Sequence, residues 1–262
     1  MNLQDTHRQI ADVALKTVDE ASVTAMSYFR QLLEIETKDD ESPVTVADKN
    51  VEAQIRKSLA EAYPDFGILG EEFGSENLEA ETYWVVDPID GTRSFISGMP
   101  LFGMLLGLVN QGKPVLGIVG MPAQDEVYIG QAGVGASMNG MPIAASAQTD
   151  LNAATLFINE TETMLAQYPD AFAKLLKTGK TRRMSYDCYP HALVAAGHID
   201  AVVDCNLQPY DYLPIVALIE AAGGLMTDWK GNPLTLHSDG RVLTAATPEL
   251  LSQLIEIVGG AA

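Results

Sequence analysis

The chain has 262 residues, and 16 Lys and Arg against 35 Asp and Glu give a formal net charge of −19. Such an acidic chain, without a dense cluster of Lys and Arg, argues against a protein that grips the phosphate backbone of nucleic acids. Hydrophobic residues make up 47% of the sequence, which is enough for a substantial core and excludes disorder as the main state. The length predicts one large domain or two modest ones.

Membrane, secretory and zinc-binding classes find no support either. The longest apolar run, Leu101–Val109, is too short for a helix that needs about 20 residues to cross a bilayer. Met1–Thr6 lacks the basic and apolar regions of a secretory signal. Cys188 and Cys205 make neither a disulfide framework nor a zinc site. We therefore expect a soluble cytoplasmic protein without membrane or nucleic-acid partners.

Two helices are predicted at the start of the chain. Apolar residues at three- and four-residue spacing predict an amphipathic helix from about His7 to Glu36. A polar stretch at 37–43 follows it. Thr45 is then expected to cap a second helix that ends before Pro64, with Asp48 in a capping-box position.

Strands are predicted next, in an antiparallel pattern. They cover residues 67–70, 83–86, 101–109, 114–119 and 127–129, with turns at 110–112 and 133–135.

From about residue 150 strands and helices alternate. Strands are predicted at 155–158 and 199–203, and helices near 168–176, at 189–196 and at 212–222, the last closed by Gly223-Gly224. This order predicts an α+β half at residues 1–145 and an α/β half at 146–262.

The most informative motif, Asp-Pro-Ile-Asp-Gly-Thr, occupies residues 87–92 directly after the strand at 83–86. The strand delivers Asp87 at its carboxyl end, where sites of α/β proteins usually lie. Pro88 keeps Asp87 extended, and a tight turn can direct Asp90 toward the same point.

The second half of the motif suits an anion. Gly91 permits close approach of the backbone, and Thr92 can begin a helix whose free N–H groups bind anions. Two carboxylates beside an anion site suit Mg²⁺, which commonly binds one or two carboxylates and phosphate oxygens. The alternative is that the motif is only an Asx-rich turn.

Three further acids stand at junctions between predicted elements, and each has a structural alternative. Glu71, beside Glu72, follows a strand and could lie in a solvated loop. Asp48 could be only the capping acid of its helix. Asp211 opens a helix and could be only a favourable N-terminal charge.

Taken in order, these motifs resemble the inositol monophosphatase family from about residue 8 to 255. The resemblance is carried by Glu71-Glu72, by residues 87–92, and by Tyr210-Asp211 before 221–224. It implies a layered α-β-α-β-α sandwich, commonly a homodimer, and a Mg²⁺-dependent, lithium-inhibited phosphomonoesterase. One departure is Tyr210, because the family usually has Trp before that last Asp.

The resemblance also implies roles for single residues, with two or three Mg²⁺ in each active site. The first metal would be held by Glu71, Asp87 and the backbone carbonyl of Ile89, and the second by Asp87, Asp90 and Asp211. Asp48 and Thr92 match the pair that activates the attacking water, with Glu71 also counted as catalytic and Asp48 near a third metal. The backbone N–H groups of Gly91 and Thr92 match the phosphate cradle.

The substrate is approached through a narrower resemblance. Residues 91–103, 185–191, 196–200 and 207–211 are similar to the histidinol-phosphate phosphatase branch. We hypothesise that Asp187 and Asp204 bind the cationic part of histidinol, because its ammonium and imidazole groups suit carboxylates. The alternative is that Asp187 caps the helix at 189–196 and that Asp204 only orients a loop.

The leading interpretation is therefore a phosphatase that acts on L-histidinol phosphate in histidine biosynthesis. The alternatives are an inositol-1-phosphate phosphatase or a phosphomonoesterase of broad specificity. An alternative of another class is a binding partner of the transcription machinery, as some bacterial relatives are. The four His residues and both Cys residues are interpreted as structural or surface residues.

Overall fold

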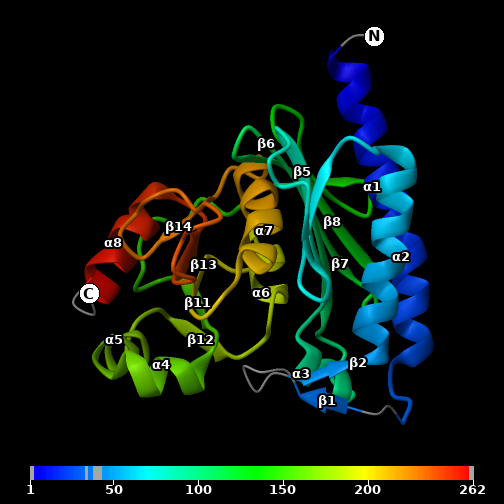
Figure 1. Cartoon of the computed structure of the whole chain (residues 1–262). Helices are drawn as coiled ribbons and strands as arrows, with labels where there is room; N and C mark the ends of the chain where they lie inside the picture. Colours follow the sequence, from blue (N-terminus) through cyan, green and yellow to red (C-terminus); the bar gives the residue numbers. More distant parts are fainter. Residues whose placement is uncertain (1–2, 33–34, 38–42, 260–262) are drawn as a thin grey trace.

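The computed structural model describes residues 3–32, 35–37 and 43–259, without the side chains of 3–7, 37 and 43. Its elements form layers, which Figure 1 shows from right to left as helices, a large sheet, helices, a smaller sheet and helices. This is the α-β-α-β-α sandwich that the sequence predicted. Within the described residues, every helix is too short or too polar to cross a bilayer.

The large sheet has eight strands and is antiparallel except where β3 and β5 run parallel. In spatial order its strands are β10 (Met141–Ile143), β9 (Gly135–Met138), β8 (Glu126–Gln131), β7 (Lys113–Met121), β6 (Gly103–Asn110), β5 (Thr82–Asp90), β3 (Gly67–Gly70) and β4 (Gly74–Glu76).

The smaller sheet has five strands and is mixed, because β11 runs parallel to both of its neighbours while β15 runs antiparallel to both of its own. Its order is β12 (Thr181–Met184), β11 (Thr155–Ile158), β13 (Ala201–Asp204), β15 (Val242–Ala245) and β14 (Leu225–Asp228). Two short strands, β1 (Ile35–Thr37) and β2 (Pro43–Thr45), pair apart from both sheets.

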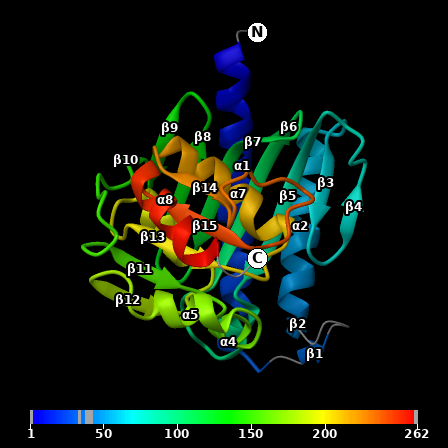
Figure 2. The same cartoon turned by 90° about the vertical axis from the view of Figure 1, so that its left-hand side faces the viewer.

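The helices cover these sheets on three levels (Figures 1 and 2). One face of the large sheet is covered by α1 (Leu3–Tyr28) and α2 (Val46–Ala62), and α6 (Tyr189–Ala195) and α7 (Pro209–Ala221) lie between the sheets. The outer side carries α4 (Thr161–Gln167), α5 (Pro169–Leu175) and α8 (Pro248–Val258), while α3 (Thr92–Ile96) follows β5.

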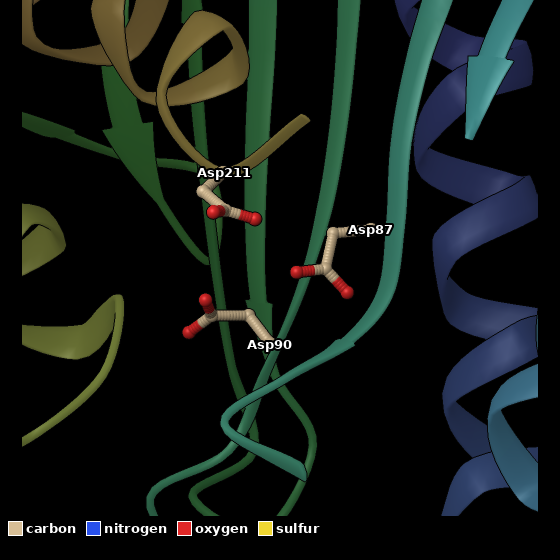
Figure 3. Close-up of side chains that lie close together, drawn as sticks. All are labelled: Asp87, Asp90 and Asp211. Atoms are coloured by element: carbon tan, nitrogen blue, oxygen red, sulfur yellow. The ribbon is translucent and has the colours of Figure 1, made fainter. Parts of the chain in front are cut away.

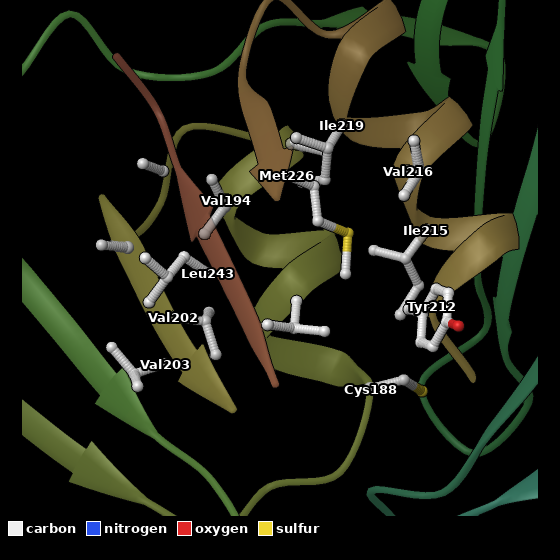
Figure 4. Packing of buried hydrophobic residues seen from close by; sticks show 14 of the residues in the cluster. Cys188, Val194, Val202, Val203, Tyr212, Ile215, Val216, Ile219, Met226 and Leu243 are labelled. Atoms are coloured by element: carbon white, nitrogen blue, oxygen red, sulfur yellow. The ribbon is translucent and has the colours of Figure 1, made fainter. Parts of the chain in front are cut away.

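Two buried clusters hold the layers together. The first lies between α1, α2 and the large sheet, and includes Val18, Ile55 and Trp84. The second lies on the opposite face of the large sheet and extends through α6 and α7 into the smaller sheet. It includes Ile215 of α7 and Val202 of β13 (Figure 4). This second cluster draws on both sides of the proposed boundary between 1–145 and 146–262, and that division remains a prediction.

The first predicted helix extends too far at its C-terminal end. The helix α1 ends at Tyr28, and Ile35–Thr37 forms β1. Arg30 adopts a left-handed conformation with a φ of 61°, which ends a helix as a C-cap residue does. Phe29 still packs on two aromatic rings of the first cluster, so the apolar spacing continues after the helix has stopped. Residues 33–34 and 38–42 lie outside the described part of the chain.

Most other predicted elements are present with small shifts at their ends. The capping box of Thr45 and Asp48 is confirmed at the start of α2. The elements that were not predicted are short ones with little alternation of their own and those after residue 224: β1, β2, β4, β9, β10, α4, β12, β14, β15 and α8.

Three glycines of the large sheet let α7 lie directly on it. A Cβ on Gly117 would come 1.8 Å from the carbonyl oxygen of Pro214, and a Cβ on Gly130 would come 2.4 Å from the Cα of Leu218. Gly107 would bring a Cβ to 3.0 Å from the Cα of Pro214. The backbone of α7 therefore has no room for side chains beneath it, and these glycines set its height above the sheet.

We predict that Gly117→Ala lowers the free energy of unfolding by about 1–3 kcal/mol, because the new methyl group forces α7 away from the sheet. Urea unfolding measures the effect. Gly259→Ala is the control, since apart from its chain neighbours and the backbone of its own helix no described atom lies within 4 Å of its ideal Cβ position. Equal stability of the two variants would contradict the close seating of α7.

Candidate metal centre

A β-bulge brings two acids of β5 to the same face of the sheet. In a regular strand a three-residue spacing would place Asp87 and Asp90 on opposite faces. Asp87 pairs with Leu105 and Asp90 pairs with Gly103, so three steps along β5 match two steps along β6. The extra residue turns Asp90 back toward the side of Asp87. The expected tight turn after Asp87 is thus a bulge within a longer strand.

The third acid comes from the first turn of α7. Asp211 forms a capping box with Gln208, in which Asp211 Oδ2 accepts the Gln208 N–H at 2.7 Å. One ligand oxygen each from Asp87, Asp90 and Asp211 lies within 4.8 Å of the others. Figure 3 shows the three side chains close together, with Asp87 and Asp90 on β5 and Asp211 at the start of α7. Asp211 is therefore both a helix cap and a member of the acidic cluster.

This cluster lines a cavity of about 400 Å³ that also receives most of the other predicted site residues. The predicted residues that line it are Glu71, Asp87, Ile89, Asp90, Gly91, Thr92, Asp187, Asp204 and Asp211. Six of these predicted residues are acids, and Glu160 is a seventh acid in the lining. Among the lining residues Arg93 is the one Arg or Lys. A dianionic phosphate would be repelled from this cavity unless cations reversed its field.

Burial raises the pKa of each acid in the cluster, and the neighbouring carboxylates raise it further. The pKa values of Asp87 and Asp211 lie well above their usual range; after burial, the main causes are the charges of Glu71 for Asp87 and of Asp90 for Asp211. Burial, with the charge of Asp187, raises the pKa of Asp90 to about 7. Ionisation of these acids is disfavoured by burial and by their mutual repulsion, and a cation between them would oppose both effects, so the donor set fits a divalent ion that prefers oxygen ligands.

Thr92 connects the cavity to the start of α2. Its Oγ1 lies 3.3 Å from Asp48 Oδ1 and 3.2 Å from the carbonyl oxygen of Ile89. The other oxygen of Asp48 accepts the N–H of Thr45 at 2.9 Å and its hydroxyl at 2.6 Å. Asp48 is fully buried. It is the capping acid and at the same time a partner of Thr92, so the two interpretations of Asp48 are compatible.

Asp187 lies against the backbone of the Asp-Pro-Ile-Asp-Gly-Thr motif. Ser94 Oγ donates to Asp187 Oδ2 at 2.5 Å, and a Cβ on Gly91 would come 2.6 Å from Asp187 Cγ. The next residue, Cys188, donates its N–H to Asp90 Oδ2 at 2.7 Å. Cys188, not Asp187, is the N-cap residue of α6, and it makes no side-chain capping bond. Asp187 therefore faces the cavity and does not cap that helix.

Asp204 is held more tightly than Asp187. Its Oδ1 accepts the N–H of Cys205 at 2.8 Å, and its Oδ2 lies 2.8 Å from Asn159 Nδ2 and 3.2 Å from His191 Nε2. His191 Nδ1 in turn lies 2.8 Å from Thr244 Oγ1. Asp204 is only 2% exposed. This carboxylate is thus fixed in the cavity wall by protein donors on both of its oxygens.

Several residues around Asp187 and Asp204 were not predicted from the sequence. Asn159 donates to Asp204 and also to the carbonyl oxygen of Asp187 at 2.8 Å, which ties the two substrate-binding candidates together. Glu160 lines the cavity, and burial together with the charge of Asp204 raises its pKa. The signal in the sequence for Asn159 and Glu160 is that two polar residues directly follow the apolar strand β11. His191, interpreted as structural, is structural in its contacts but also lines the cavity.

We expect the metal-free protein to lose stability as the pH rises. The pKa of Asp90 is about 7 when folded and near 3.8 otherwise, so between these values the folded state binds more protons than the unfolded chain. The free energy of unfolding therefore falls with rising pH. Asp90→Asn should reduce this fall and raise the unfolding temperature at pH 8, by about 2–4 °C for each kcal/mol recovered.

Thermal unfolding in EDTA between about pH 5 and 8 measures this effect. Asp239→Asn is the control, because hydrogen bonding to Arg241 lowers the pKa of Asp239, so this group stays ionised from pH 5 to 8 and contributes no pH slope there. The same pH slope in wild type and Asp90→Asn would contradict the burial of an ionised Asp90.

Comparison with known proteins agrees with this site. Residues 6–261 match the family model of the inositol monophosphatase family. The chain is 36% identical over 250 residues to a histidinol-phosphatase of Chlorobaculum parvum, covering 94% of this chain and 95% of that protein. The chain belongs to the inositol monophosphatase family. It is a phosphatase of the phosphomonoester hydrolase class, and the family resemblance stated from sequence is confirmed.

Other relatives carry different names. A bifunctional phosphatase, IMPL2 of Arabidopsis thaliana, is 38% identical over 87% of this chain and 67% of that protein. An inositol-1-monophosphatase of Bacillus subtilis is 31% identical over 95% of this chain and 96% of its own, and a putative Nus factor SuhB of Neisseria meningitidis is 31% identical over 82% and 84%.

A solved structure confirms the fold. An inositol monophosphatase from Zymomonas mobilis superposes with a TM-score of 0.87 at 34% identity, covering 99% of both chains. The family is metal-dependent, which agrees with the acidic cluster of Asp87, Asp90 and Asp211.

Proposed function

We propose that this phosphatase is Mg²⁺-dependent and hydrolyses L-histidinol phosphate to L-histidinol and phosphate. The observation that carries the proposal is the placement of Asp187 in the same cavity as the acidic cluster. Its carboxylate lies over Gly91, the first residue of the expected phosphate cradle, and accepts a hydrogen bond from Ser94. A cationic leaving group bound beside the phosphate would meet this negative charge.

The metal would be held by Glu71, Asp87, Asp90 and Asp211 and by the carbonyl oxygen of Ile89. When bound, Mg²⁺ supplies the positive charge that favours ionisation of water and neutralises charge developing on phosphate oxygens. Charge stabilisation is the main requirement here, because phosphate monoester hydrolysis is among the slowest uncatalysed reactions.

The protein's own groups orient the nucleophile and the phosphate. The hydroxyl of Thr92 has one proton and two neighbouring acceptors, Asp48 Oδ1 and the Ile89 carbonyl. With its proton directed to either acceptor, Thr92 Oγ1 can accept a hydrogen bond from water and so direct a lone pair of that water toward phosphorus. The N–H groups of Gly91 and Thr92, at the start of α3, are available to phosphate oxygens.

Asp187 and Asp204 have different tasks in this proposal. Asp187 offers acceptor capacity to the ammonium group of histidinol, since a carboxylate can accept more bonds than the one from Ser94. Asp204 already accepts hydrogen bonds from Asn159 and from the N–H of Cys205 and lies 3.2 Å from His191 Nε2, so it adds negative charge to the cavity wall and orients Asn159.

We predict a kcat/KM for L-histidinol phosphate at least a hundredfold above that for inositol 1-phosphate, which is about 2.7 kcal/mol of transition-state binding. Phosphate release from both esters, with Mg²⁺ and with EDTA, measures this preference. A comparable or larger kcat/KM for the inositol ester would leave a Mg²⁺-dependent phosphatase of inositol phosphate or broad specificity. Turnover that is unaffected by EDTA would contradict the metal proposal.

Asp187→Ala should raise KM for L-histidinol phosphate by about tenfold or more while changing KM for inositol 1-phosphate little. The reason is that only the first leaving group carries a positive charge for the lost carboxylate, and one charged contact of about 1.5–3 kcal/mol corresponds to this range. Steady-state kinetics on both esters test it. Equal losses on the two substrates would show that Asp187 serves the phosphate site and not the leaving group.

The remaining parts of the proposal follow the family resemblance. They are a homodimer, inhibition by lithium, two or three Mg²⁺ in each site, a cytoplasmic location and a role in histidine biosynthesis. A role as a partner of the transcription machinery is the alternative suggested by the relatives named SuhB. Asp90→Asn separates the two, since a binding role should survive this substitution and turnover should not.

A further inference from the structure

One face of α2 carries three charged residues at successive turns toward the end of β3. Asp48, Glu52 and Arg56 follow one another at four-residue spacing, which places them on the same side of the helix. Asp48 reaches the cavity through Thr92, as described above. Glu52 is also fully buried, although it does not line the cavity and has no role in the mechanism. A buried carboxylate of this kind is costly unless donors compensate its charge.

The donors to Glu52 come from the turn that carries Glu71. Glu52 Oε2 accepts the N–H of Glu72 at 2.7 Å, and Oε1 accepts the N–H of Phe73 at 3.2 Å. Arg56 Nε donates to Oε1 at 2.7 Å. On its other side Glu71 is fastened to β5, where its N–H donates to the carbonyl oxygen of Val86 at 3.2 Å. The backbone of Glu71 is therefore fixed between β5 and the carboxylate of Glu52.

Arg56 also binds the turn that follows β3. Its guanidinium donates to the carbonyl oxygen of Gly74 and lies 5.9 Å from the centre of the Phe73 ring. The turn after β3 is thus held by Glu52 at two amides and by Arg56 at one carbonyl.

Gly70, the last residue of β3, leaves the space in which Glu52 lies. A Cβ at this position would come 2.1 Å from Glu52 Oε1 and 2.6 Å from its Cδ. A larger residue would therefore displace the carboxylate from the turn. The position of Glu52 therefore requires a glycine at residue 70, directly before the candidate ligand Glu71.

We propose that Glu52 and Arg56 are positioning residues that hold Glu71 at the metal centre. The inference rests on the proposed function, in which Glu71 is a metal ligand. Residues that orient ligands typically contribute about 10–100-fold to metal affinity. Without two acceptor oxygens at Glu52, at least one of the amides of Glu72 and Phe73 loses its acceptor, and the turn is free to move Glu71 away from Asp87.

The test is Glu52→Gln, which keeps the size of the side chain and removes its charge. Mg²⁺ is titrated into the full chain without substrate, and binding is followed by isothermal calorimetry and by the unfolding temperature. We expect the half-saturating Mg²⁺ concentration to rise about tenfold or more. In phosphatase assays, kcat should return toward the wild-type value when Mg²⁺ is saturating, because Glu52 touches neither substrate nor metal.

Asp200→Asn is the matched control. Asp200 also accepts a backbone N–H, that of Thr155 at 2.8 Å, and a hydroxyl, that of Ser146, but it does not line the cavity. It should change the unfolding temperature without changing the Mg²⁺ concentration for half-saturation. An equal loss of Mg²⁺ affinity in this control would show a general effect of destabilisation and overturn the proposal.

Arg56 supplies a second variant in case Glu52→Gln folds poorly. The side chain of Arg56 is 15% exposed, and Arg56→Gln should weaken Mg²⁺ binding in the same direction, while Arg56→Lys should restore part of it. Wild-type Mg²⁺ affinity in both Glu52→Gln and Arg56→Gln would overturn the inference and leave the proposed function intact. A wild-type protein that does not bind Mg²⁺ would instead overturn the proposed function, and the inference with it.

Discussion

The mutual repulsion of closely placed carboxylates is the constraint around which the other features are arranged. Asp87, Asp90 and Asp211 bring oxygens within 4.8 Å of one another, in a setting that raises the pKa of all three. A fold would not keep these groups together unless strong local contacts held each of them. The bulge in β5 fixes the first two, and the seating of α7 on sheet glycines fixes the third. A cation that binds between the carboxylates removes this repulsion, and the relief contributes to the free energy of its binding.

The two substrate-binding candidates are arranged differently from the three clustered acids. Asp87, Asp90 and Asp211 converge closely enough to share a cation. Asn159 instead joins the other two, because it donates to the carbonyl oxygen of Asp187 and to the carboxylate of Asp204. The charge of Asp187 still acts on Asp90, so the candidates for metal binding and for recognition of the leaving group share one cavity.

Much of the site could be predicted from sequence because its residues follow strong local signals. The motif at 87–92 combines Asp, Pro, Gly and Thr in one short stretch, and the order of the other acids supplied the family resemblance. The bulge could not be predicted, because it depends on pairing between β5 and β6 and not on β5 alone. Asn159 and Glu160 were missed for a related reason, since their meaning appears only when β11 and β13 lie side by side.

The fold was predicted unevenly for similar reasons. Long segments such as the amphipathic α2 and the continuously apolar α7 were recognised, while short strands such as β9 and β12 were not. Such strands have too few residues to show alternation, and their pairing with a neighbour defines them. The end of α1 at Tyr28 was hidden because Phe29 continues the apolar spacing from a turn.

Asp48 and Asp211 each use one oxygen to begin a helix, which has a consequence for the entropy of binding. A capping hydrogen bond fixes the rotamer of its side chain as soon as the helix forms. The conformational freedom of these two acids is therefore lost during folding, not when a ligand arrives. Binding then requires little further ordering of either side chain, so more of the electrostatic attraction remains as affinity. In this protein helix initiation and preorganisation of the site are the same structural event.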